Sequence, residues 1–320
     1  MKKQNLFSVL LLVCSLSFIG CSDDDDSSTV VNDDKSIADI VIENENYSSL
    51  EAALIKTDLV TTLSGDTEFT VFAPSNDAFA AFLSDNGFSN LDEVPTDVLR
   101  QILLNHVLAG EIESDEINTG YVNSLAIEES TQSNLSMYLD TSNGVVINGN
   151  VAVVNADIDA DNGVIHAVNS VISLPTVVTF ATADPNFSSL VSALTREESF
   201  SYVNTLSTPA GTTPAPFTVF APTNDAFASL ITELEVGGLS DIDTAVLEAT
   251  LNMHVIAEAN VRSEDLSSGT VTTLGGDVLI NASNATITDA NGRESSIIVT
   301  NVQAANGVIH AIDKVILPQL

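Results

Sequence analysis

The sequence has few basic residues, few aromatic residues and almost no cysteine. Only 9 of its 320 residues are Lys or Arg, against 44 Asp and Glu, so the formal net charge is −35. Nucleic acids and anionic membranes are bound through clustered Lys and Arg, which excludes nucleic-acid binding and a polybasic membrane patch. Two cysteines cannot build a disulfide framework. The chain is nevertheless 44% hydrophobic, enough for a packed core rather than a disordered acidic chain.

The first 20 residues have the layout of a secretory signal. Two lysines precede an apolar stretch over residues 6–19, which is shorter than the roughly 20 residues needed to cross a bilayer. The stretch ends in Gly20 and Cys21, which resembles the lipobox of bacterial lipoproteins, where the Cys thiol is acylated and becomes the N-terminus. We therefore expect residues 1–20 to be a lipoprotein signal peptide and Cys21 to be the lipidation site. The alternative is ordinary secretion with soluble release.

Four adjacent aspartates at positions 23–26 follow this cysteine. Like charges so close together repel one another and cannot pack, so residues 21–35 are expected to form a solvated acidic tether. The arrangement also resembles the acidic export signal of Bacteroidota lipoproteins, which sends them to the outer face of the outer membrane; a mere spacer is the alternative. The sequence thus predicts a surface-exposed protein of the bacterial outer membrane, in contact with the membrane through its lipid anchor only.

Two segments of the chain repeat almost letter for letter. Residues 69–80 (FTVFAPSNDAFA) recur at 217–228, and residues 162–167 (NGVIHA) recur at 306–311. A period of this length indicates two tandem domains, because the repeats of solenoids are about 20–50 residues long. The boundary falls after Pro175, which gives domain 1 over residues 36–175 and domain 2 over residues 176–320.

Each repeat combines strand and helix signals. Residues 69–73 are β-branched and aromatic on both faces, which predicts a buried strand, and Ser75 is a suitable N-cap for a helix after it. Residues 96–108 are expected to form a second helix with an apolar stripe. Residues 144–154 and 164–172 read as strands joined through an Asn-Gly turn. We classify each domain as α+β, with a small β-sandwich-like sheet and helices packed against it.

These landmarks resemble those of the fasciclin domain. The run TVFAP(S/T)NDAF resembles the first conserved box of that family, and NGVIH with the apolar run after it resembles the second. His106 and His254 fall where the family has its Tyr-His motif, although Asn105 and Met253 replace the Tyr. The resemblance spans nearly all of residues 36–320. It implies two tandem fasciclin-like domains, each a wedge-shaped β-sandwich with helices, that work outside the cell in adhesion or protein–protein contact without a common catalytic activity.

All four histidines occupy two repeat-equivalent positions, His106 with His254 and His166 with His310. Either each domain carries a site, or each domain needs the same polar contact in its core. A buried imidazole can satisfy backbone groups through both nitrogens, and the sequence has no tight His/Cys cluster of the kind a metal site needs. We interpret the histidines as structural and expect no metal and no cofactor. Nucleophile-elbow, Walker and dinucleotide-binding motifs are also absent, so we expect no enzyme.

An acidic segment at residues 157–163 of the first repeat admits several interpretations. Its alternating Asp residues resemble the start of an EF-hand loop, but Gly163 comes one residue late and no Glu closes the loop, so at most weak calcium binding is expected. Within the fasciclin resemblance, Asn155, Asp157 and Ile158 line up with a segment that some animal fasciclin domains use in integrin-dependent adhesion. These three residues are our candidate contact site, and a plain acidic turn is the alternative.

The sequence therefore predicts a monomeric, non-enzymatic cell-surface lipoprotein that acts in adhesion or protein–protein interaction. Its expected partner is an unidentified protein or glycan on a cell surface or matrix. The alternative function is a carbohydrate-binding envelope lipoprotein for glycan capture, which the absence of Trp and the aromatic content of 5% disfavour. A hydrolase hidden in the fold is a third possibility. It would need a convergent Ser/His/Asp geometry, and burial of both His106 and His166 far from any Ser would exclude it.

Overall fold

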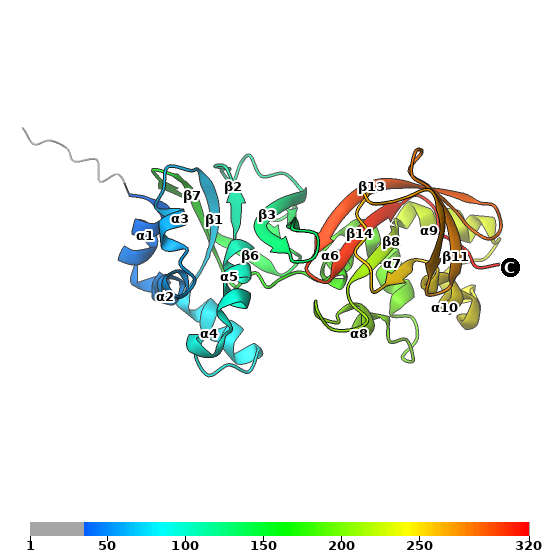
Figure 1. The fold of residues 1–320 in the computed structure, drawn as a ribbon, viewed down its shortest axis with the longest axis horizontal. Coiled ribbons are helices and arrows are strands. Elements are labelled where there is room, and N and C mark those ends of the chain that lie inside the picture. Colours follow the sequence, from blue (N-terminus) through cyan, green and yellow to red (C-terminus); the bar gives the residue numbers. More distant parts are fainter. Residues whose placement is uncertain (1–34, 320) are drawn as a thin grey trace, which may run out of the picture. The chain divides into compact units, whose positions relative to one another are not determined.

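The computed structural model describes residues 35–319. The expected signal peptide, Cys21 and nearly all of the acidic tether lie outside these residues. Figure 1 shows the described chain, in which two successive segments repeat the same order of helices and strands.

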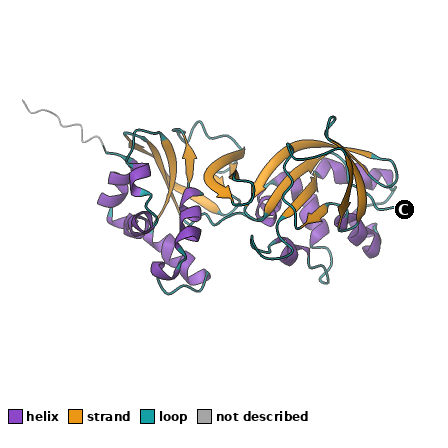
Figure 2. Ribbon diagram, viewed as in Figure 1, coloured by secondary structure: helices purple, strands orange, loops and turns teal. Residues whose placement is uncertain are grey.

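Domain 1 begins with helices and ends with strands. In the view of Figure 2, its helices gather on one side of its strands. In chain order its elements are α1 (Ile37–Glu43), η1 (Glu45–Tyr47), α2 (Ser48–Lys56), α3 (Val60–Leu63), β1 (Phe69–Pro74), α4 (Asn76–Asp85), η2 (Leu91–Glu93), α5 (Thr96–Leu104), β2 (Val107–Ala109), β3 (Gly120–Glu128), β4 (Ser133–Asp140), β5 (Val146–Ile147), β6 (Val151–Ala160) and β7 (Gly163–Val168).

Domain 2 repeats this order. Its elements are α6 (Val177–Ala183), η3 (Pro185–Phe187), α7 (Ser188–Leu194), α8 (Tyr202–Leu206), β8 (Phe217–Pro222), α9 (Asn224–Glu233), η4 (Leu239–Asp241), α10 (Thr244–Asn252), β9 (Val255–Ala257), β10 (Gly269–Thr273), β11 (Gly276–Asn281), β12 (Thr286–Thr288), β13 (Glu294–Ala304) and β14 (Gly307–Ile312).

The first strand of each domain pairs with the last. Strand β1 is antiparallel to β2 and parallel to β7, and the seven strands of domain 1 close into a barrel. In domain 2, β8 likewise lies between β9 and β14, in a seven-stranded sheet ordered β10-β11-β12-β13-β14-β8-β9. The α+β fold class predicted from the sequence is therefore confirmed.

The repeated box forms the strand and helix that the sequence predicts. All six residues of β1 and of β8 are buried, which explains why neither strand alternates polar and apolar residues. Ser75 caps α4 by accepting a hydrogen bond from the Ala78 N–H, and Thr223 caps α9 in the same way, each at 3.3 Å. Such a cap satisfies one of the free N–H groups at a helix start.

The core of each domain lies on both sides of its first strand. In domain 1, Phe69 and Val71 pack against the helices, whereas Phe72 belongs to a second cluster among the strands, together with Met137. Domain 2 has the same division, with Phe217 and Val219 in one cluster and Phe220 in the other. Side chains of a strand alternate between its two faces, so one strand serves both clusters.

Three expectations about element boundaries are wrong. The strand predicted over residues 164–172 is β7, which ends at Val168. The helix predicted over residues 96–108 ends at Leu104, because Val107 pairs with Val71 of β1 and begins strand β2. The strand predicted over residues 144–154 is broken into β5 and β6 by a turn at Asn148 and Gly149, whose φ angles are 49° and 76°. Asn and Gly are the residues that adopt this left-handed backbone most readily.

Candidate contact sites

Asp157 lies inside strand β6 (Val151–Ala160), so the alternative interpretation of the acidic segment as a plain turn is wrong for Asp157. The pairing of β6 with β7 shifts between Asn155 and Ile158, which marks a β-bulge, and Asp157 has a left-handed φ of 58°. The extra residue of a bulge interrupts the alternation that a sequence pattern relies on. The turn comes later, at Asp161 and Asn162.

The Asp157 carboxylate ties the β2–β3 loop to this bulge. It accepts hydrogen bonds from the backbone N–H of Ser114 at 2.8 Å and from the Ser114 hydroxyl at 2.5 Å. These two bonds to the charged form are the main reason why the pKa of Asp157 lies below its ordinary value. The Asp157 N–H donates to Nδ1 of His166 at 3.2 Å.

Domain 2 makes the same connection with an uncharged side chain. Asn301 lies at the equivalent bulge with a φ of 60°, and its Oδ1 accepts from the Ser263 N–H at 2.8 Å. Its own N–H donates to Nδ1 of His310 at 3.4 Å. The fold therefore needs a hydrogen-bond acceptor at this bulge, but it does not need a charge.

The three candidate contact residues differ in what they offer to a partner. Asn155 is exposed, and its neighbour Val154 is 65% exposed. The Asp157 side chain remains 43% exposed despite its bonds to Ser114. Ile158 is only half-exposed, because it packs against the helix-side core of domain 1. The accessible surface at this bulge therefore consists of Val154, Asn155 and the outer side of Asp157.

His106 and His254 are buried, and both ring nitrogens of each bind the backbone. Nδ1 of His106 lies 2.7 Å from the Ile102 carbonyl oxygen, and Nε2 accepts from the Ile172 N–H at 2.8 Å. His254 binds Thr250 and Ile316 in the same way, at 2.8 and 3.0 Å. Because Nε2 accepts, the proton sits on Nδ1 and the ring is neutral. Burial lowers the pKa of both histidines to about 4.

His166 and His310 have equivalent positions on β7 and β14. Nε2 of His166 lies 3.0 Å from the Ile112 carbonyl oxygen, and Nε2 of His310 lies 2.9 Å from the Val261 carbonyl oxygen. Their Nδ1 atoms accept the N–H groups of the two bulges. Each ring thereby joins a strand, a bulge and a loop, and these bonds leave no ring nitrogen free to act as a base.

Two asparagine pairs were missed as key residues by the sequence reasoning. Oδ1 of Asn162 accepts from the Ile37 N–H, and its Nδ2 donates to the Leu63 and Gly65 carbonyls, all at 2.8 Å. Asn306 repeats these three bonds with Val177, Leu206 and Thr208. Asn76 and Asn224, the first residues of α4 and α9, likewise connect these helices to the starts of α2 and α7. The signal was their presence in both repeats.

The positions of the missing Tyr are closed to partners. Asn105 is 0% exposed and donates from Nδ2 to the Ser173 carbonyl at 3.1 Å, while Met253 is 2% exposed. Within residues 35–319, no group of three His, Cys, Asp or Glu side chains is arranged to hold a metal ion. No helix in that part of the chain is long and apolar enough to span a membrane.

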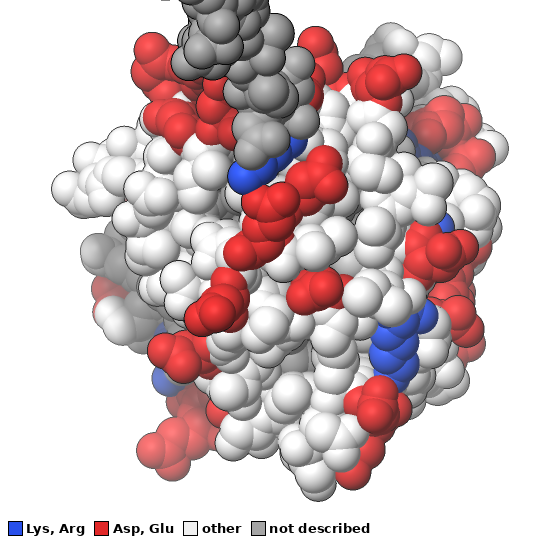
Figure 3. All heavy atoms as spheres, turned by 90° about the vertical axis from the view of Figure 1, so that its left-hand side faces the viewer, with Lys and Arg blue, Asp and Glu red and all other residues white. Residues whose placement is uncertain are grey.

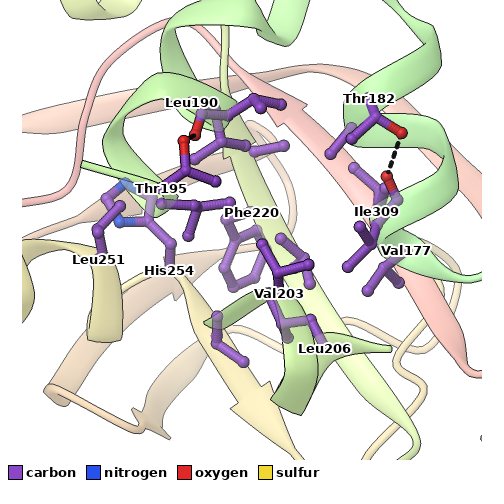
Figure 4. Close-up of a pocket in the computed structure, with 17 residues that line it drawn as sticks. Val177, Thr182, Leu190, Thr195, Val203, Leu206, Phe220, Leu251, His254 and Ile309 are labelled. Carbon is purple, nitrogen blue, oxygen red and sulfur yellow. Dashed lines mark hydrogen bonds between the residues drawn. The ribbon is translucent and has the colours of Figure 1, made fainter. Parts of the chain in front are cut away.

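Each domain contains a small apolar cavity between its helices and its first strand. The cavity of domain 2 (Figure 4) has a volume of about 40 Å³ and that of domain 1 about 20 Å³. The hydroxyls of Thr182 and Thr195 at the domain 2 cavity donate to carbonyls of their own helices, at 2.9 and 2.8 Å. Ligand pockets usually measure about 300 Å³ or more. These cavities are therefore packing gaps rather than ligand sites.

Comparison with known proteins identifies the architecture. The profile of the family described as "Fasciclin domain" matches residues 45–175 and 185–318. The chain belongs to the fasciclin domain family. Fasciclin domains are associated with cell adhesion and protein interaction, and the family is a non-enzymatic, adhesion-type domain. The tandem fasciclin organisation predicted from the sequence is thus confirmed.

Relatives of this fasciclin protein occur in bacteria and animals. Protein sll1483 of Synechocystis is 38% identical over 122 residues, which cover 34% of this chain and 68% of the relative. The transforming growth factor-beta-induced protein ig-h3 of Sus scrofa is 28% identical over 260 residues, or 80% of this chain and 35% of the relative. The chain therefore spans about a third of that animal protein.

A solved structure has the same fold. It is the FAS1 domain pair of the insect cell adhesion molecule fasciclin I, which is 19% identical and superposes with a TM-score of 0.54. The match covers 86% of this chain and 98% of the insect chain.

Proposed function

We propose that this fasciclin protein is a non-enzymatic, lipid-anchored module for adhesion or protein–protein interaction at the surface of a bacterial outer membrane. Cys21 is the proposed anchor, and the aspartates at positions 23–26 are the proposed export signal. The location rests on these sequence features, and the mode of action rests on the family.

One observation carries the non-enzymatic part of this proposal. A catalytic site inherited by both repeats would use residues that the two repeats share. The main shared polar residues are the four histidines and the equivalent residues Asn162 and Asn306. Their side chains form hydrogen bonds with backbone groups. A general base must reach its proton with a free lone pair. The shared histidines and asparagines therefore maintain the fold and offer no free base for catalysis.

A protein partner fits this surface better than a glycan. Sugar-binding sites stack rings on exposed Trp or Tyr, and the chain has no Trp and four Tyr. Tyr47 and Tyr138 are buried, and Tyr121 and Tyr202 are half-buried. Acidic side chains are spread over the face of domain 1 shown in Figure 3, with few basic ones among them. Such a surface keeps the protein soluble and favours basic partners.

The anchor and the function are tested in cells that express the full-length protein. We expect the wild-type protein to be labelled by a palmitate analogue and to be digested by protease added outside the cells. The Cys21→Ala variant should not be labelled. Adhesion of these cells to a matrix or to partner cells should fall when the gene is deleted and return with the wild-type chain. A label retained by Cys21→Ala would contradict the anchor, and unchanged adhesion after deletion would contradict the function.

A further inference from the structure

An open groove of about 390 Å³ lies on domain 2, beside the start of α9. One wall is formed by the cap of η3, Asp184, and another by Asp225 in the first turn of α9. The bulged part of β13 supplies Ile298 and Val299, which are 53% and 43% exposed. Exposed apolar side chains next to polar walls are typical of binding grooves.

Tyr121 of domain 1 forms the edge of this groove and is held firmly in place. Both domains belong to one compact unit, Lys35–Leu320. The Tyr121 ring packs edge-on against Phe180 of domain 2, with ring centroids 5.7 Å apart. It also packs, at a tilt, against Tyr138, with ring centroids 5.0 Å apart. Its hydroxyl donates to Oδ2 of Asp184 at 3.1 Å. Burial and the charge of Asp184 raise the pKa of Tyr121, so the hydroxyl stays a donor.

Asp184 is a buried carboxylate without a cation. It is 5% exposed, and among residues 35–319 its side chain accepts hydrogen bonds from the Asn186 N–H, at 2.9 Å, and from Tyr121. Across the part of the chain that the structure describes, no Lys or Arg forms an ion pair with it, and no Lys or Arg lines the groove. A buried charge with no opposite charge nearby is costly to the fold.

The fold of domain 1 shows that this charge is not needed for capping. Asn44 is the residue equivalent to Asp184, and it caps η1 by accepting from the Asn46 N–H at 3.0 Å. A neutral amide oxygen therefore performs the same local task. At the capping position itself, a carboxylate is thus present in domain 2 and an amide in domain 1, where the acidic residue is the neighbouring Glu45. The carboxylate of Asp184 lies next to Ile298 and Val299, where domain 1 has Val154 and Asn155.

We propose that this groove binds an Arg or Lys side chain of a partner protein between Asp184 and Asp225, with a neighbouring apolar side chain resting on Ile298 and Val299. The proposal rests on the function proposed above and names the partner's chemistry. Charge complementarity selects this occupant: the groove is acidic and apolar, and the whole chain is strongly acidic, which steers basic partners toward it.

The test uses the full-length protein in detergent micelles and a capped peptide, acetyl-Val-Arg-Leu-amide. Its counterpart with citrulline has the same shape and no charge. The methyl NMR signals of Ile298 and Val299 are followed during titration. We expect these signals to shift with the arginine peptide and the citrulline peptide to bind about tenfold more weakly, as for a desolvated charge pair. Equal affinity for both peptides, or signals of Ile298 and Val299 that do not move, would overturn the proposal.

Two variants locate the charge. Asp184→Asn keeps the cap, as Asn44 shows, and should weaken the arginine peptide by at least about fivefold. Asp225→Asn should weaken it as well, whereas Asp77→Asn, the matched change in domain 1, should leave the affinity unchanged. Wild-type affinity in Asp184→Asn would refute the site. Adhesion of cells, measured separately after gene deletion, reports on the proposed function, so the two failures are distinguishable.

Discussion

Asn162 and Asn306 bind equivalent backbone groups in their two domains: one N–H group at a helix start, one carbonyl at the last residue of a helix and one carbonyl two residues beyond it. Each side chain thereby joins the turn before the last strand to two helical segments near the start of its domain. The exact repetition of these bonds at two places in one chain identifies the asparagine as a requirement of the fold.

Replacing this asparagine should destabilise its domain strongly. Asn162→Ala leaves the Ile37 N–H and two carbonyls without partners, and we expect the free energy of unfolding of domain 1 to fall by about 3 kcal/mol. Urea unfolding measures the change, and the exposed Asn155→Ala serves as the control, with an expected effect within about 0.5 kcal/mol. A loss below about 1 kcal/mol for Asn162→Ala would mean that water replaces the side chain without cost.

The buried histidines should make the protein less stable in mild acid. The pKa of His106 and His254 is about 4 in the folded protein, below the ordinary value of 6.5. Because the unfolded chain takes up protons first, stability is fully present above pH 6.5 and falls as the pH drops toward 4. In this range each histidine lowers the free energy of unfolding by about 1.4 kcal/mol for each unit by which the pH falls.

NMR titration of the histidine Cε1–H signals checks this directly. The signals of His106 and His254 should stay at their neutral positions down to about pH 5. Titration of either signal near pH 6.5 would show that burial does not hold the ring neutral. Urea unfolding at several pH values then measures the accompanying loss of stability.

The two cavities offer a reciprocal test of packing. Ala181 lines the cavity of domain 2, and the equivalent residue in the smaller cavity of domain 1 is Val41. Ala181→Val should fill part of the gap and raise the stability of domain 2 by about 0.5–1 kcal/mol. Val41→Ala should enlarge the other gap and cost about 2 kcal/mol. Thermal unfolding measures both, and a loss in Ala181→Val would show that the gap has the wrong shape for two more methyl groups.

Asp157 can be separated into its structural and its contact role. Because Asn301 makes the equivalent bonds, Asp157→Asn should keep the stability within about 0.5 kcal/mol, whereas Asp157→Ala should cost about 1–2 kcal/mol. Adhesion that falls in Asp157→Asn while the melting temperature holds would assign the carboxylate to a partner contact. An Asn variant as unstable as the Ala variant would contradict the equivalence of the two bulges.

The sequence was informative wherever both repeats carry the same residues. The strand at Phe69, the cap at Ser75 and the tandem fasciclin fold were predicted from such residues. When the fold needs a particular residue at a position, both domains carry that residue, and the repetition is visible in the sequence. The end of α5 was misplaced, since His106 continues the apolar stripe although the chain has already left the helix at Asn105. An apolar stripe shows that side chains are buried, but it does not show whether the backbone that carries them is helical or extended.

The bulge at Asp157 and the groove beside α9 could not be predicted. A residue with a positive φ breaks the alternation of a strand without leaving a composition signal, so an acidic strand end looked like a turn. The groove combines Asp184, Asp225 and Ile298, which come from three distant parts of the chain. The pairing of β13 with β14 and of β14 with β8 brings Ile298 near the start of α9, and the hydrogen bond from Asn224 to the Pro185 carbonyl brings that start next to Asp184.

The pairing of each first strand with its last has a consequence for the order in which each domain can fold. Strand β8 lies between β9 and β14, and Gly307 at the start of β14 approaches Phe217 so closely that an added Cβ would overlap the backbone of that residue. A nascent domain therefore lacks a central strand until almost its entire length is available. A chain that emerges from its N-terminus during synthesis would therefore complete each domain only after the last strand of that domain has been released.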